Sequence, residues 1–164
     1  MFLGELNGFT CCSADIGNEY LNSKTKEKVY IITGGEFGRL AGRTMIIIMA
    51  LYGLRTSGAR FWEHLAATLR KFGFTSSKAD PNMWYRKKGS FYEFIATWVD
   101  DVLAWSDDPM AIMEELRKIY TLKGVGFPEY YLGGDFEYMN EHWTKEQINL
   151  GFSATTYITN VISK

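Results

Sequence analysis

The sequence is organised around Phe94-Ile95-Ala96-Thr97-Trp98-Val99-Asp100-Asp101-Val102-Leu103-Ala104-Trp105, two apolar strand-like segments separated by two adjacent aspartates. Aspartate is common in turns, so an ordinary hairpin turn explains the pair. Two-residue hairpin turns, however, favour Asn-Gly or Asp-Gly, because both positions need a positive φ. Adjacent carboxylates also repel each other, and a bound cation would relieve that repulsion. This stretch alone supports a turn and a metal-binding role for Asp100 and Asp101 equally well.

The segments on either side alternate between strand and helix patterns. A polar turn sequence at residues 87–90 joins two strand-like segments and predicts a hairpin. Further along, Asp108-Pro109 supplies a cap residue followed by proline at the first helical position, which predicts a helix that runs to about Tyr120. The helical spacing predicts its buried stripe as Ile112, Met113, Leu116, Ile119 and Tyr120.

An earlier amphipathic helix is predicted over residues 58–72, with Ser57 as its cap and Gly73 at its end. Phe61 and Trp62 on this helix are expected in the core. The other expected elements are strands at 10–16, 29–32, 44–50 (buried), 83–86, 91–99, 102–105 and 130–138, the last interrupted by Gly133-Gly134, and a terminal helix at 154–162. This order predicts an α+β fold, one domain over residues 1–164, in which helices cover one face of an antiparallel sheet.

Composition and charge exclude several classes of protein. The chain has 164 residues, 46% of them hydrophobic, and its longest apolar run, residues 45–51, is too short to span a membrane. The N-terminus has neither a basic segment nor a long apolar stretch, so we expect an intracellular, cytoplasmic protein. A net charge of −1 argues against strong autonomous binding to nucleic acid, because that affinity comes largely from neutralising phosphates. The adjacent Cys11 and Cys12 should be reduced, and no His or Cys spacing suits zinc.

Single residues elsewhere are ambiguous when taken alone. Asp15 ends a predicted strand, where a turn residue is the commoner explanation than a functional one. Tyr20 is explained as a core residue and Tyr131 as an ordinary strand aromatic. Other acidic residues are expected as helix caps, at Asp107 and Asp108, or on solvated helix faces, at Glu63, Glu114 and Glu115.

Five motifs taken together nevertheless resemble the reverse transcriptase of copia-type LTR retrotransposons. They occur in the order of that family, from about residue 14 to the end of the chain. The motifs are Ala14-Asp15-Ile16-Gly17-Asn18-Glu19-Tyr20-Leu21, Ala50-Leu51-Tyr52-Gly53-Leu54-Arg55, Gly73-Phe74 with Ser77-Lys78-Ala79-Asp80-Pro81, Trp98-Val99-Asp100-Asp101 and Tyr131-Leu132-Gly133.

This resemblance implies a polymerase palm, with a ferredoxin-like core, and an RNA-directed DNA polymerase that acts by two-metal nucleotidyl transfer to a primer 3′-hydroxyl. Asp15, Asp100 and Asp101 would be the catalytic, metal-binding carboxylates on adjacent strands, although Asp15 and Asp100 lie far apart in sequence. Two Mg²⁺ ions, or Mn²⁺ as a substitute, suit such hard oxygen ligands. We also expect at least one carboxyl pKa to be raised without metal, because like charges disfavour joint ionisation.

The resemblance also implies binding residues and partners. Tyr20 would pack under the sugar of the incoming nucleotide and reject a 2′-hydroxyl. The expected partners are an RNA or DNA template with its primer and dNTPs, within a larger polyprotein and without a membrane. The other implied contacts are nucleotide binding by Tyr52, Gly53 and Arg55, and a primer grip at Tyr131, Leu132 and Gly133.

Three positions depart from the family pattern. Glu19 replaces a small residue beside the nucleotide sugar, Trp98 replaces a tyrosine, and Gly58 replaces a proline. We further expect that most of the fingers, the thumb and RNase H are missing. Three interpretations therefore stay open: a truncated palm that is weakly active or inactive alone, a non-catalytic remnant with the same fold, and an unrelated α+β binding module.

Overall fold

A computed structural model describes residues 4, 6–139 and 149–163. The chain forms two compact units. We call Met1–Ile16 with Thr75–Lys164 the sheet unit and Gly17–Phe74 the hairpin unit. Within the described residues, no helix is both long and apolar enough to cross a lipid bilayer.

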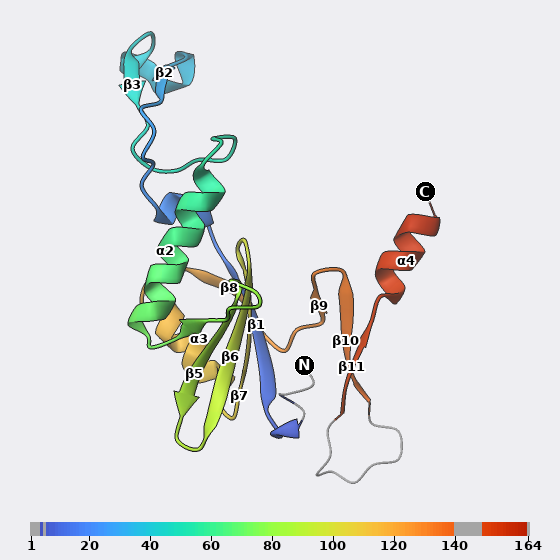
Figure 1. The fold of residues 1–164 in the computed structure, drawn as a ribbon. Coiled ribbons are helices and arrows are strands. Elements are labelled where there is room, and N and C mark those ends of the chain that lie inside the picture. The colour runs from blue at the N-terminus through green and yellow to red at the C-terminus, as the bar shows by residue number, and fades with distance from the viewer. Residues whose placement is uncertain (1–3, 5, 140–148, 164) are drawn as a thin grey trace. The chain divides into compact units, whose positions relative to one another are not determined.

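The sheet unit is built on a six-stranded antiparallel sheet (Figure 1). Its strands pair mostly with their sequence neighbours, but β1 inserts between β7 and β8. The strands, in their order across the sheet, are β4 (Thr75–Ser76), β5 (Met83–Lys88), β6 (Phe91–Trp98), β7 (Asp101–Ser106), β1 (Thr10–Ile16) and β8 (Leu122–Gly126). The predicted hairpin is confirmed as β5–β6, with Gly89 (φ 60°) in its turn.

Helix α3 (Pro109–Arg117) packs on β1, β7 and β8 and so covers one face of this sheet. The predicted start is confirmed, since the Asp108 carboxylate accepts a hydrogen bond from the Ala111 N–H at 3.2 Å. The helix ends three residues earlier than predicted. Ile119 lies beyond the end of the helix, and it is 43% exposed instead of buried as predicted. Ile112 and Leu116, within the helix, are buried as predicted.

The opposite face of the sheet carries a second apolar cluster, centred on Leu103 and Trp105. Cys11 of β1 belongs to this cluster, while Cys12 faces the helix side, with its Sγ 3.5 Å from the Met110 Sδ. Both cysteines are free and buried. Phe136 is also buried in the cluster, and the half-buried Phe127 and Tyr131 are among the residues that pack against it.

Residues 130–138 form a hairpin instead of the single interrupted strand predicted. Leu132 and Gly133 occupy its turn with φ of 48° and 85°, the positive values that a tight hairpin needs. A side chain at Gly134 would put its Cβ 2.0 Å from the ring of Phe152, so only glycine fits there. The elements are β9 (Tyr130–Tyr131), β10 (Gly134–Met139), β11 (Asn149–Ser153) and the predicted terminal helix, α4 (Thr155–Ile162).

The hairpin unit contains the predicted long helix, α2 (Ser57–Lys71). Ser57 does not cap it: Thr56 holds the cap position, and the Ser57 hydroxyl donates to the Leu51 carbonyl at 2.6 Å. Phe61 is buried as expected, but Trp62 is 37% exposed. The remaining elements are η1 (Glu19–Asn22), β2 (Tyr30–Ile32), η2 (Gly35–Leu40) and β3 (Thr44–Ile46).

The prediction of a buried strand at 44–50 is wrong. Among the described residues β3 pairs only with β2, and this two-stranded ribbon leaves Ile32 78% and Ile46 48% exposed. Ile48, just after β3, is 62% exposed. Apolar composition favours extended backbone. Burial needs an opposing layer as well, and neither strand of the ribbon is part of the larger sheets.

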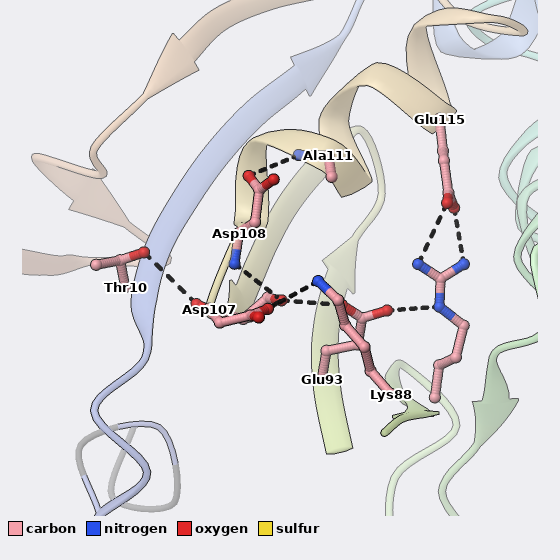
Figure 2. A network of polar contacts seen from close by, with 9 residues as sticks. Thr10, Lys88, Glu93, Asp107, Asp108, Ala111 and Glu115 are labelled. Carbon is pink, nitrogen blue, oxygen red and sulfur yellow. Dashed lines mark hydrogen bonds and ion pairs between the residues drawn. The ribbon is translucent and has the colours of Figure 1, made fainter. Parts of the chain in front are cut away.

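A network of charged side chains ties the β5–β6 hairpin to α3 (Figure 2). The Glu93 side chain, 1% exposed, accepts hydrogen bonds from Arg86 Nε at 2.5 Å and from the Ser106 hydroxyl at 2.9 Å. Arg86 also binds Glu115 through both terminal nitrogens, so Glu115 is not the solvated residue predicted. Lys88 pairs with Asp107 at 2.7 Å. Buried Glu93 is thereby balanced by cations and hydrogen bonds.

Candidate active site

The structure brings together the three aspartates that the sequence singled out. Asp15 is on β1 and lies directly opposite Asp101 on β7. Side chains that lie opposite each other on antiparallel strands leave the same face, with Cβ atoms about 5 Å apart. Asp100 precedes β7, and its carbonyl accepts a hydrogen bond from the Ile16 N–H at 2.8 Å. The backbone thus holds Asp100 beside the end of β1.

The turn that contains Asp100 is strained. Trp98 pairs with Asp101, so the turn residues are Val99 and Asp100, and Asp101 is the first residue of β7 instead of a turn residue. Val99 has a φ of 53°, which a β-branched residue rarely adopts. Strain of this kind is concentrated at functional sites in proteins.

The carboxylates repel each other electrostatically. The pKa of Asp101 is raised, first by burial and then by the charges of Asp100 and Asp15. This confirms the expectation of a raised pKa in the cluster. A divalent cation would remove the like-charge repulsion that contributes to this shift.

The aspartates suit a magnesium ion in their donor chemistry. Within residues 4, 6–139 and 149–163, no three His, Cys, Asp or Glu side chains form a group that would hold a metal by themselves. Mg²⁺ commonly takes only one or two carboxylates and completes its shell with water and substrate phosphates. The arrangement therefore fits a metal that is bound together with a phosphorylated ligand.

Tyr131 lies near this cluster. Its pKa is raised, mainly by burial and secondly by the charge of Asp101. The phenol oxygen is buried and has no hydrogen-bond partner within the part of the chain that the structure describes. Leu132 and Gly133 form the adjacent turn, where Leu132 is 52% exposed.

The other predicted binding residues belong to the hairpin unit. The rings of Tyr20 and Tyr52 meet edge to face, with centroids 4.6 Å apart. Gly53 has a φ of 89°, a conformation that favours glycine, and Arg55 is exposed. Glu19 is only 3% exposed, at the start of η1, and does not project as a free surface carboxylate.

Sequence reasoning missed Lys123. This residue lies directly opposite Asp15 on β8, as Asp101 does on β7. Trp98, Asp101, Asp15 and Lys123 consequently form a row across four strands. No local signal marks Lys123, because the pairing joins segments about a hundred residues apart.

Comparisons with known proteins agree with the motifs. A family model described as reverse transcriptase (RNA-dependent DNA polymerase) matches residues 5–164. A putative transposon Ty5-1 protein of Saccharomyces cerevisiae is 27% identical over 124 residues, which cover 73% of this chain and 40% of that protein. The retrovirus-related Pol polyprotein from transposon RE1 of Arabidopsis thaliana is 23% identical over 124 residues, covering 73% of this chain and 8% of the polyprotein. The match spans less than half the length of either relative.

Proposed function

Because the chain belongs to the family of reverse transcriptases (RNA-dependent DNA polymerases), of the copia type, we propose that it is the palm segment of a retrotransposon polymerase that extends a primer 3′-hydroxyl. The observation that carries this proposal is the pairing of Asp15 with Asp101, with Asp100 held beside them. Asp15 and the adjacent Asp100 and Asp101 come from two segments far apart in sequence and lie at neighbouring strand ends of one sheet. The unrelated binding module among the earlier interpretations is thereby set aside.

In this proposal Asp15 and Asp100 hold the metal ions, and Asp101 supports them. Two Mg²⁺ ions, or Mn²⁺ in their place, supply activation of the primer hydroxyl and stabilisation of the leaving pyrophosphate. Burial and mutual repulsion raise the pKa of Asp101, so the protein itself favours whatever cation neutralises the cluster. The backbone hydrogen bond from Ile16 to Asp100 keeps the two strand ends aligned for that purpose.

The binding residues have matching roles. Tyr20, supported by the ring of Tyr52, packs against the sugar of the nucleotide. Gly53 and Arg55 contact the nucleotide and template. The primer lies against the turn Tyr131-Leu132-Gly133, where the exposed Leu132 provides an apolar contact.

The partners are an RNA or DNA template with its primer and dNTPs, within a larger polyprotein in the cytoplasm. At a net charge of −1 the chain alone has no excess of positive charge with which to neutralise phosphates. Primer and template should therefore dissociate readily at physiological salt. We therefore expect the isolated chain to bind divalent ions without extending a primer.

A non-catalytic remnant is the second candidate. It is favoured by Glu19, a carboxylate in the motif that should meet the nucleotide sugar, and by Trp98 in place of tyrosine. Both candidates predict metal binding, and they differ in whether a rebuilt enzyme polymerises.

Metal binding by Asp100 tests the proposal directly. Asp100→Asn should weaken the binding of Mn²⁺, measured by electron paramagnetic resonance, by about tenfold, because one charged ligand is lost. Glu114→Gln is the matched control, since this exposed carboxylate on α3 pairs only with Arg117 among the described residues. Equal Mn²⁺ affinity of Asp100→Asn and wild type would contradict the proposal.

Primer extension separates the two candidates. The purified chain should not extend a primed RNA template with Mg²⁺ or Mn²⁺. Robust extension that Asp100→Asn abolishes would exclude the remnant. Within a full-length chimera, Glu19→Ala should restore extension if Glu19 alone blocks the nucleotide.

A further inference from the structure

We propose that Tyr131 is a positioning residue of the metal site, whose phenol oxygen accepts a hydrogen bond from a water molecule on the metal ion beside Asp101. This inference rests on the proposed function and gives Tyr131 a role in metal binding that is separate from any contact with the primer. It starts from the face of the sheet on which Tyr131 packs.

Tyr131 and the aspartates lie on the same face of the six-stranded sheet. Asp101 and Leu103 are two residues apart on β7, so their side chains leave the same face, about 7 Å from each other along the strand. Asp15 pairs with Asp101 and shares that face. Tyr131 packs against the apolar cluster that contains Leu103. The phenol ring therefore lies on the carboxylate side of the sheet, opposite the side that α3 covers.

The hydroxyl of Tyr131 is a polar group in apolar surroundings. Its oxygen is buried and has no hydrogen-bond partner within residues 4, 6–139 and 149–163. Burying an unbonded hydroxyl costs free energy, whereas a phenylalanine ring would fill the same space without that cost. Phe136, in the cluster that Tyr131 packs against, shows that a plain phenyl ring suits this layer. The hydroxyl therefore calls for a ligand from outside the cluster.

The negative charge that acts on this hydroxyl is that of Asp101. Burial and, secondly, this charge raise the pKa of Tyr131, so the phenol keeps its proton at neutral pH. Tyr131 and Asp101 are not hydrogen-bonded to each other, and polar groups at such a separation are often bridged by water. Mg²⁺ bound by one or two carboxylates keeps several waters. A hydrogen bond from one of them to the phenol oxygen would hold that water in place and strengthen metal binding.

The backbone of the β9–β10 turn separates this hydroxyl from the proposed primer contact. Leu132 follows in the turn and is 52% exposed, as is Tyr130 on the other side. Tyr131 is half-buried between these two exposed residues, because successive residues of a strand alternate between faces. The side chain that meets the primer is therefore Leu132, and the ring of Tyr131 is directed to the sheet.

Removing the hydroxyl alone distinguishes this role from a structural one. In the metal-free protein, Tyr131→Phe removes an unbonded buried polar group, so stability should stay the same or rise. In the metal-bound protein, the same variant lacks one hydrogen bond, so metal affinity should fall. A hydroxyl that only supported the fold would give the reverse result: lower stability without metal and unchanged metal affinity.

The test uses the full chain with Tyr131→Phe. Tyr130→Phe is the matched control, because it removes the same hydroxyl from the adjacent, exposed residue of β9. Electron paramagnetic resonance measures Mn²⁺ binding, and urea denaturation without metal measures stability. Tyr131→Phe should weaken Mn²⁺ binding roughly threefold to tenfold, the loss of one hydrogen bond, and should leave the urea midpoint unchanged or higher. Tyr130→Phe should match wild type in both measurements.

Three outcomes overturn this inference. Mn²⁺ affinity could be unchanged in Tyr131→Phe, or could fall equally in Tyr130→Phe, which would indicate an effect of the surface. The urea midpoint of Tyr131→Phe could fall, which would give the hydroxyl a partner within the protein, such as the buried indole N–H of Trp105. These outcomes leave the proposed function intact as long as Asp100→Asn weakens Mn²⁺ binding. Failure of wild-type protein to bind Mn²⁺ would instead overturn the proposed function, and this inference with it.

Discussion

The two units of the chain use similar apolar strands with opposite results. In the sheet unit, Ile95 and Val102 on central strands are fully buried, and α3 covers their sheet. In the hairpin unit, Ile32 and Ile46 on the β2–β3 ribbon are 78% and 48% exposed. The difference teaches that an apolar run specifies extended backbone, whereas covering layers decide whether that run contributes to stability.

The largest expected effect compares two isoleucines. Ile95→Ala should lower the free energy of unfolding by about 4 kcal/mol, because it leaves a cavity in a fully packed layer. Ile32→Ala, the same change at an exposed position, should cost about 0.5 kcal/mol or less. Urea denaturation followed by circular dichroism measures both. Similar losses for the two variants would show that the ribbon is buried in solution and would break the comparison.

The next effect compares two glutamates that each contact two cations. Glu93, which is 1% exposed, binds Arg86 and Lys88, whereas Glu63 is 47% exposed and binds Lys26 and Arg60. Glu93→Gln should cost about 3 kcal/mol, because it removes the buried charge of the network and leaves half-buried Arg86 with Glu115 as its remaining counter-charge. Glu63→Gln should cost about 0.5 kcal/mol, as for surface pairs.

Salt provides the control for the two glutamates. The same urea experiment at high ionic strength should abolish the small Glu63→Gln effect and preserve most of the Glu93→Gln effect, because buried pairs are screened less. A Glu93→Gln effect that disappears with salt would mean that the network in Figure 2 is solvated.

The smallest effect concerns pH and has opposite signs in the two units. The folded-state pKa of Asp101 is raised, so the folded protein binds more protons than the unfolded chain, and stability falls as pH rises through the folded pKa. Asp101→Asn should therefore stabilise the protein at pH 7, by about 1 kcal/mol or less, and leave it unchanged below the ordinary aspartate pKa. Urea titrations at both pH values measure this, and Mg²⁺ should reduce the gain at pH 7.

His64 in the hairpin unit provides the reverse case. Burial, and secondly the charge of Lys71, lower the pKa of His64, so the folded protein binds fewer protons than the unfolded chain. Stability therefore falls as pH falls through the ordinary histidine range. The stability of His64→Gln relative to wild type should accordingly be higher near pH 5 than near pH 8. Destabilisation by Asp101→Asn at pH 7 would contradict the repulsion in the cluster.

Local patterns predicted the elements that local interactions determine. Three such features each act within a few residues: the cap at Asp108, the helical spacing on α2 and the glycine turn at residue 89. The structure confirms all three, and the two helices begin within one residue of their predicted starts. Predictions failed where a distant segment decides the outcome. Glu115 is paired with Arg86 from another strand, and Trp62, assigned to the core from its sequence neighbourhood, is partly exposed.

The amino-acid sequence by itself determined the family, the α+β class and the three aspartates, because motifs and periodicity are properties of short segments. Tertiary structure alone decided that Asp101, Asp15 and Lys123 stand in one row. The reason is physical: hydrogen bonds between strands bring together residues 15, 101 and 123, and a bulge at Gly124 sets the final register. No spacing within the sequence encodes that alignment.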